Sequence, residues 1–97
     1  MANQIRMTPD QLRTQAAELR SCADSTEQNM QKMLKVIDSV TQGWSGEAIQ
    51  ENVTRIQNEM RSVSMLQDGV KALAEMLEQA ARAVEESESQ IASMFRF

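Results

Sequence analysis

The chain has 97 residues, enough for one small domain, with ten Lys and Arg against fourteen Asp and Glu and no His. Three Gly and one Pro are too few for a multi-stranded sheet with its turns, and the net charge of −4 excludes a basic surface for nucleic acid. The chain is also rich in good helix formers, so we expect an all-α protein. Because His is the commonest general base and metal ligand, we expect that it is not an enzyme and holds neither a metal nor another cofactor.

The single cysteine and the hydropathy of the chain limit the class of protein further. Cys22 cannot form an internal disulfide, and we expect it to be a small buried hydrophobe beside the first apolar stripe. No apolar run approaches the roughly 20 residues of a membrane span, and the N-terminus lacks the apolar core of a cleavable signal peptide. The expectation is a helical protein that is made in the cytoplasm and does not insert stably into a membrane.

The first helix has a strong start signal in Thr8-Pro9-Asp10-Gln11. Thr8 and Gln11 are spaced for a capping box, Pro9 takes the first helical position, and Asp10 places a negative charge at the positive end of the helix dipole. Behind this signal, apolar or small residues recur at alternating intervals of four and three, as in the seam of a coiled coil. The pattern predicts one helix over about residues 9–42, roughly 50 Å long. Its inward stripe is Leu12, Ala16, Leu19, Ala23, Thr26, Met30, Met33, Ile37, Val40 and Trp44.

The segment Gly43-Trp44-Ser45-Gly46 interrupts this pattern, with Gly43 suited to a C-cap and Ser45 to an N-cap. A turn as short as residues 43–46 makes the flanking helices antiparallel, and the second helix is predicted over about residues 47–92. Its stripe has one irregular step, from Val63 to Leu66, so we expect a bend or a close helix contact near residues 63–70. The predicted stripe is Ile49, Val53, Ile56, Met60, Val63, Leu66, Val70, Leu73, Leu77, Ala80, Val84, Ser87, Ile91 and Met94.

Two helices alone form a thin core, and neither a disulfide nor a metal is available to stabilise it. We therefore predict an antiparallel helix–turn–helix hairpin that dimerises into an elongated four-helix bundle. The residues expected in the core of the hairpin and of the dimer are Leu12, Leu19, Met30, Met33, Ile37, Val40, Ile49, Val53, Ile56, Met60, Val63, Val70, Leu73 and Leu77.

The two predicted arms differ in length. Folding back at residues 43–46 places Pro9 beside a residue near 80, so the chain after about residue 82 overhangs the first helix. The apolar pattern nevertheless continues there, and we expect this C-terminal tail, about residues 83–97, to recognise a partner. Its acidic residues, Glu85, Glu86 and Glu88, are expected to form a solvated face.

A length near one hundred, the helical hairpin, and Trp44-Ser45-Gly46 in the turn together resemble the WXG-100 (ESAT-6-like) family of type VII secretion substrates. The opening segment, residues 5–12, also resembles the start of such proteins in Gram-positive bacteria. The family carries a C-terminal export signal, of which the Tyr-containing form is absent because the chain has no Tyr. The broader form is a hydrophobic residue, an acid and two further hydrophobic residues at fixed spacing. This form is matched by Val84, Glu88, Ile91 and Phe95.

The resemblance implies a bacterial, virulence-associated protein that leaves the cell folded, without a cleavable signal, through an FtsK/SpoIIIE-type secretion ATPase. The implied partners are a second copy or a WXG paralogue, and a larger co-secreted effector. Trp44 and Gly46 of one chain would lie near the export motif of the other and form a composite signal. Trp44 could equally plug the end of the bundle, and the two roles are compatible.

Two further function classes stay open at this point. The first is a cytoplasmic coiled-coil interaction module, or a chaperone-like partner of a larger effector, with no export of its own. The second is a membrane-active amphipathic helix, which is disfavoured because the polar face is acidic whereas helices on membrane surfaces are usually rich in Lys and Arg.

Overall fold

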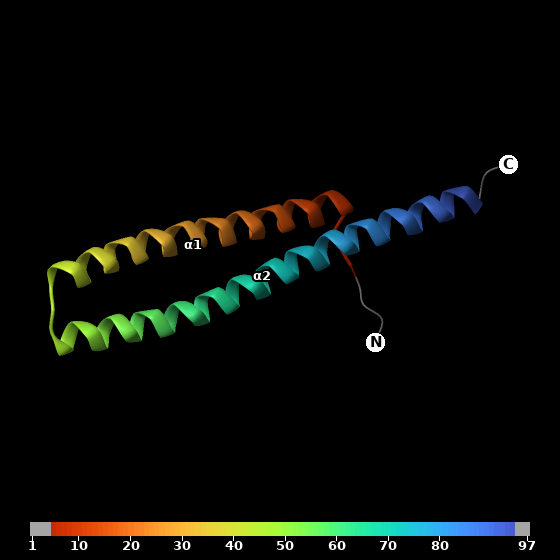
Figure 1. Ribbon diagram of the computed structural model, residues 1–97. Coiled ribbons are helices and arrows are strands. Elements are labelled where there is room, and N and C mark those ends of the chain that lie inside the picture. Colours follow the sequence, from red (N-terminus) through yellow and green to blue (C-terminus); the bar gives the residue numbers. More distant parts are fainter. Residues whose placement is uncertain (1–4, 95–97) are drawn as a thin grey trace.

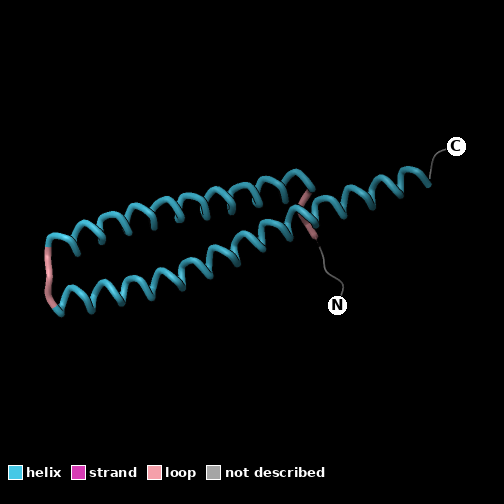
Figure 2. The backbone as a smooth tube through the Cα atoms, viewed as in Figure 1, coloured by secondary structure: helices cyan, strands magenta, loops and turns pink. Residues whose placement is uncertain are grey.

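The computed structural model describes residues 5–94 and contains two long helices in that range. Helix α1 runs Pro9–Gly43 and helix α2 runs Glu47–Met94. The two lie side by side and antiparallel, joined by the short connection at residues 44–46 (Figures 1 and 2). The predicted all-α helical hairpin is therefore confirmed.

The start of α1 has the predicted capping box. The backbone N–H of Gln11 donates to the Thr8 hydroxyl oxygen at 3.1 Å, and the backbone N–H of Thr8 donates to Oε1 of Gln11 at 2.9 Å. Pro9 occupies the first helical position. These contacts satisfy two of the backbone donors that a helix leaves unpaired at its N-terminus, so the direction of the chain into α1 is defined locally.

The turn differs in detail from the expected caps. Gly43 is the last residue of α1, and Trp44 follows in an extended conformation, with its N–H donating to the Val40 carbonyl at 2.9 Å. Gly46, not Ser45, precedes α2 directly, and its carbonyl accepts the first helical bond from Gln50 at 3.1 Å. Gly46 adopts φ of +158°, a value that residues with a Cβ rarely adopt. The glycine of the Trp-x-Gly turn is thus required by the backbone that starts α2.

The seam between the helices is a regular seven-residue repeat. The buried residues of α1 fall on the predicted stripe and confirm it for Leu12, Ala16, Ala23 and Met30; those of α2 are Met60, Gln67, Ala74 and Ala81. Of the bend or close helix contact expected near residues 63–70, the structure has the contact: Gln67 is buried at the seam against Ala23 of α1, while Leu66 and Leu73 of the predicted stripe are exposed. A polar residue at a seam position interrupted the apolar pattern without interrupting the helix geometry.

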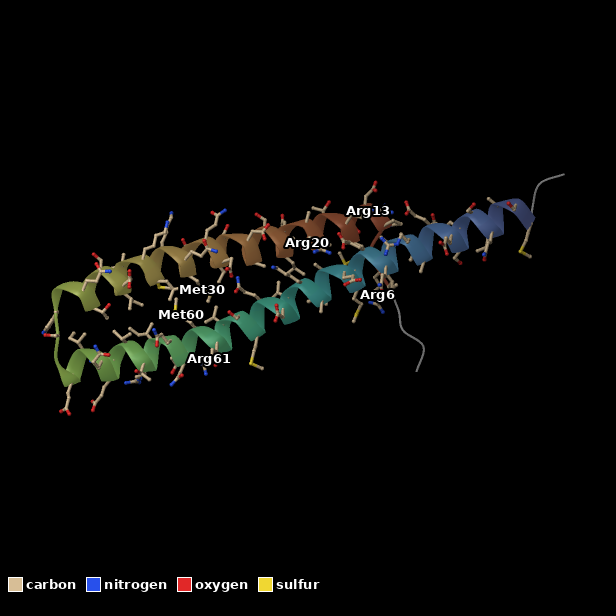
Figure 3. All side chains as sticks on the ribbon, in the orientation of Figure 1. Arg6, Arg13, Arg20, Met30, Met60 and Arg61 are labelled. Atoms are coloured by element: carbon tan, nitrogen blue, oxygen red, sulfur yellow. The ribbon has the colours of Figure 1, made fainter. Side chains whose placement is uncertain are left out.

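Side-chain size along this seam determines how closely the helices approach. Ala16, Ala74 and Ala81 are fully covered where α1 begins, whereas Met30 and Met60 separate the helices nearer the turn (Figure 3). Figure 1 shows the ribbons closest at the start of α1 and farthest apart at the turn. Small residues allow close approach and Met does not, so the hairpin is tight at one end and open at the other.

Polar contacts cross the tight half of the hairpin. Nε2 of Gln67, whose side chain is buried, donates to the Ala23 carbonyl at 2.8 Å. Arg13 pairs with Glu85, and Nε of Arg20 donates to Oε2 of Glu78 at 3.3 Å. The three acids of the predicted solvated face, Glu85, Glu86 and Glu88, are all exposed, and Glu85 in addition pairs with Arg13 of α1.

These ion pairs change the titration of the two acids. The hydrogen bond from Arg20 lowers the pKa of Glu78, and the hydrogen bond from Arg13 lowers the pKa of Glu85. In both cases desolvation acts in the opposite direction but is the smaller effect. The pairs have partly exposed side chains, so they set the register of the helices more than the overall stability.

Candidate functional site

The two segments expected to act in export lie at opposite ends of the hairpin. Trp44 and Gly46 are in the turn, and Val84, Glu88 and Ile91 are on the far part of α2 (Figure 1). At 1.5 Å per residue, about 56 Å of helix separates Glu47 from Val84. One chain therefore does not bring the turn and the motif together, and a composite site needs a second chain that runs in the opposite direction.

The projecting end of α2 starts later than the sequence suggested. Glu85 still pairs with Arg13, so the overhang begins after Glu85 and not after residue 82. Val84 is half-buried beside α1, whereas Glu88 and Ile91 are exposed. Phe95, the last residue of the motif, lies outside the described residues. Ala81 is the last buried residue of α2, so the seam itself ends close to residue 82, and the Arg13–Glu85 pair extends the contact beyond it.

Trp44 is exposed over 63% of its surface, so the indole does not pack inside the hairpin of one chain. An apolar ring of this size on the surface is a common anchor for a protein partner. Ser45 and Gly46 are exposed beside it. If Trp44 plugs the end of a bundle, the other wall of that site comes from another chain.

The hairpin has two unlike faces on either side of its seam. Arg13 and Arg20 each precede a seam residue, Ala16 or Ala23, by three positions. Leu19 instead follows Ala16 by three positions. The arginines and Leu19 therefore lie on opposite sides of the seam. We call the side opposite the ion pairs the apolar face. Its residues are Leu19, Thr26, Met33, Val36, Val40, Ile56, Val63, Leu66, Val70 and Leu73.

Two grooves lie on the apolar face. The larger, about 440 Å³, is near the turn and is lined by Lys32, Met33, Val36, Ile37 and Ile56. The smaller, about 90 Å³, is at the middle of the hairpin and includes Cys22, Val63 and Leu66 in its lining. Cys22 is exposed there, so the expectation of a buried cysteine was wrong. Apolar grooves of this kind on one side of a hairpin are typical of a helix-packing surface.

The residues expected in the core of the hairpin and the dimer fall into three groups. Leu12, Met30 and Met60 are buried within one chain. Leu19, Ile37, Ile49, Val53, Val63, Val70 and Leu77 are half-buried, and Met33, Val40, Ile56 and Leu73 are exposed. The role of the half-buried and exposed residues in a dimer stays a prediction.

Sequence reasoning missed the polar contacts that align the helices. Arg13 and Arg20 are seven residues apart, and so are their partners Glu78 and Glu85. This matched spacing is visible in the sequence and predicts two ion pairs at equivalent levels of an antiparallel seam. Gln67 had a comparable signal, because it lies seven residues from Met60 and from Ala74.

In the described residues 5–94, no group of three or more His, Cys, Asp or Glu side chains could hold a metal ion. Neither helix, within the same range, contains a stretch apolar enough to cross a membrane. The candidate site consists of the turn, the apolar face and the end of α2, where Trp44, Met33 and Ile91 are exposed.

Comparison with known proteins agrees with this geometry. A family model, WXG100, described as proteins of 100 residues with WXG, matches residues 4–89. A comparison with curated proteins found no match. Proteins of the WXG100 family are small helical substrates of type VII secretion and typically form dimers. The match covers all of α1, the turn Trp44-Ser45-Gly46 and α2 as far as residue 89, and the chain belongs to the WXG100 family.

Proposed function

We propose that this protein is exported as a folded dimer through a type VII secretion system, and that it accompanies a larger secreted effector as an adaptor. The signal is composite: the overhang of α2 from one chain and the Trp-x-Gly turn of the other. An FtsK/SpoIIIE-type ATPase of the secretion system reads this signal. The protein is made in the cytoplasm, needs no cleaved leader for this route, and performs no catalysis.

The observation that carries the proposal is the projection of α2 beyond α1. Glu88 and Ile91 are exposed on a helix that no other described element covers, at the spacing of the export motif. A structural residue at these positions would be expected to contact α1, as Ala81 does. An exposed acid and an exposed apolar residue on a projecting helix offer a partner both charge and apolar area.

The apolar face supports the dimer. Its larger groove lies beside the turn, where Met30 and Met60 hold the helices apart, and Met33 and Ile56 line it. A second hairpin that packs antiparallel on this face fills the groove with its own apolar side chains and completes four helices. The same arrangement places each overhang next to the turn of the other chain, where Trp44 is exposed.

Export is tested with variants that leave the hairpin intact. A chain that ends at Ser87 keeps the Arg13–Glu85 pair and lacks only the overhang. Glu88→Gln and Ile91→Asp change the motif, and Glu75→Gln is the matched control because it neutralises an exposed acid of α2 outside the overhang. In a strain with a type VII system, the first three are expected to accumulate in the cells, and the control is expected in the medium.

Trp44→Ala tests the other half of the composite signal. It is expected to block export while circular dichroism and sedimentation show a folded dimer. Normal export of both Trp44→Ala and Val84→Ala dimers would refute the composite signal. Normal export of the chain that ends at Ser87 would refute the role of the overhang and favour a cytoplasmic interaction module instead.

A further inference from the structure

Helix α2 carries a second apolar stripe that the hairpin does not use. Met65, Gly69, Ala72 and Met76 follow one another at intervals of four, three and four, so they share one face of the helix. We call these four residues the outer stripe. Each lies two residues from a seam residue, Gln67 or Ala74, and two residues turn a helix by about 200°. The outer stripe therefore points away from α1, and Met65 and Met76 are 74% and 61% exposed.

Gly69 has no explanation within one chain. A glycine inside a helix makes helix formation about five-fold less favourable than an alanine would. A Cβ built on Gly69 meets no atom within 4 Å. The hairpin thus leaves room for any side chain at this position. Gly69 and the neighbouring Ala72 together remove bulk at the centre of the outer stripe, which permits close approach of another helix backbone.

The residues along this face are arranged symmetrically. Met65 and Met76 lie equally far on either side of the point between Val70 and Lys71, as do Gly69 and Ala72. This point is also the middle of α2, which runs Glu47–Met94. A second α2 placed antiparallel across it would put Met65 beside Met76 of the other copy and Gly69 beside Ala72 of the other copy.

Charge follows the same symmetry. The intervals of three and four continue beyond both ends of the outer stripe. They reach Arg55 on one side and Glu86 on the other, at equal distances from the point between Val70 and Lys71. Both residues are exposed, and neither belongs to an ion pair found within residues 5–94. In the antiparallel arrangement, Arg55 of each copy faces Glu86 of the other, so the contact gains two opposite-charge pairs.

We propose that a second copy of this chain packs antiparallel on the outer stripe, α2 against α2, with its two-fold axis between Val70 and Lys71. The contact is distinct from the apolar face, because that face flanks the seam and the outer stripe lies behind it. Two hairpins that dimerise through their apolar faces keep both outer stripes free. The outer stripe then joins one dimer to the next, and this association does not depend on export.

Charge reversal tests the arrangement. Arg55→Glu places two acids opposite each other, and Glu86→Arg places two bases opposite each other. Each variant is expected to raise the dissociation constant of this contact about ten-fold, and the double variant is expected to restore it. Arg61→Glu is the matched control and is expected to leave the association unchanged. Arg61 lies outside the outer stripe, in a third groove of about 200 Å³ that it lines with Met30 and Met60.

The readout is analytical ultracentrifugation of the purified full chain from about 5 µM to about 1 mM, the range in which weak contacts form. If two chains already pair through their apolar faces, association through the outer stripe appears as a dimer-to-tetramer step. If the apolar face stays unpaired, it is a monomer-to-dimer step, and the same variants act on it. Reversal variants that associate like the native chain, or a double variant that stays as weak as the single ones, would overturn the proposal.

Cross-linking tests the register without relying on charge. In the Cys22→Ser background, a mixture of Met65→Cys and Met76→Cys chains is expected to form a disulfide-linked pair on mild oxidation. Either variant alone is expected to cross-link much more slowly, because the antiparallel register separates identical positions by about 11 residues, or about 16 Å along the helix. Equal rates for the mixture and for the single variants would refute this register.

Discussion

Replacing Ala81 by Leu tests the tight half of the hairpin most directly. Ala81 is fully covered, at the level where Leu12 and Ala16 of α1 are also buried. Leu adds three carbon atoms to a site that has no free surface, so the helices must move apart or the side chain must leave its preferred rotamer. Overpacking of this kind costs about 1–3 kcal/mol, which is a large part of the about 5–15 kcal/mol that stabilises a domain.

The midpoint of thermal unfolding measures this cost. For a chain of this size each 1 kcal/mol corresponds to about 4–8 °C, so a cost of about 2 kcal/mol lowers the midpoint by about 8–16 °C. Far-ultraviolet circular dichroism follows the transition, at one protein concentration for all variants because association shifts the midpoint. The control is Ala17→Leu, an exposed position of α1, with an expected change below about 0.5 kcal/mol. Equal midpoints for Ala81→Leu and the native chain would refute the close approach of the helices.

Three further predictions concern the contacts that align the helices. Gln67→Ala is expected to lower the free energy of unfolding in urea by about 1–2 kcal/mol, because it removes the hydrogen bond to Ala23 and leaves a gap; a larger midpoint than native would contradict this. Thr8→Ala is expected to lower the free energy of unfolding by about 1 kcal/mol in the same assay, because it removes the capping box. Thr8→Asp can still cap the helix and is expected to keep most of this stability. The pKa values of Glu78 and Glu85 are lowered in the fold, so their pairs stabilise it fully above the ordinary value of 4.5 and lose this effect as the pH falls through the lowered values. Unfolding midpoints between about pH 5 and about pH 2 check this, and a variant with both acids changed to Gln should show a weaker dependence.

Much of the fold could be predicted because its signals are local. The capping box depends on four consecutive residues, and the stripe of α1 follows from helix periodicity alone. The stripe of α2 was harder to predict because Gln67 occupies a seam position while Leu66 next to it is exposed. Burial of Gln67 depends on a carbonyl of α1, which is 44 residues away and carries no mark in the sequence.

The candidate site divides in the same way. The Trp-x-Gly turn and the spacing of Val84, Glu88 and Ile91 are properties of the sequence, and the turn lies within the family match over residues 4–89. The exposure of Trp44 and the point where α2 projects beyond α1 cannot be read from the sequence, because both depend on how the two helices are paired. A shift of the pairing by one heptad would move the start of the overhang by about 10 Å.

The sequence by itself determined two long helices, their start signal, the place of the turn and the family, since each rests on neighbouring residues or on a periodic pattern. Only the tertiary structure decided the register, the tight and open halves, and the separation of an ion-paired face from an apolar one. These features arise when side chains from distant parts of the chain meet: alanines allow the helices to approach, methionines keep them apart, and two arginines select the acids that lie opposite.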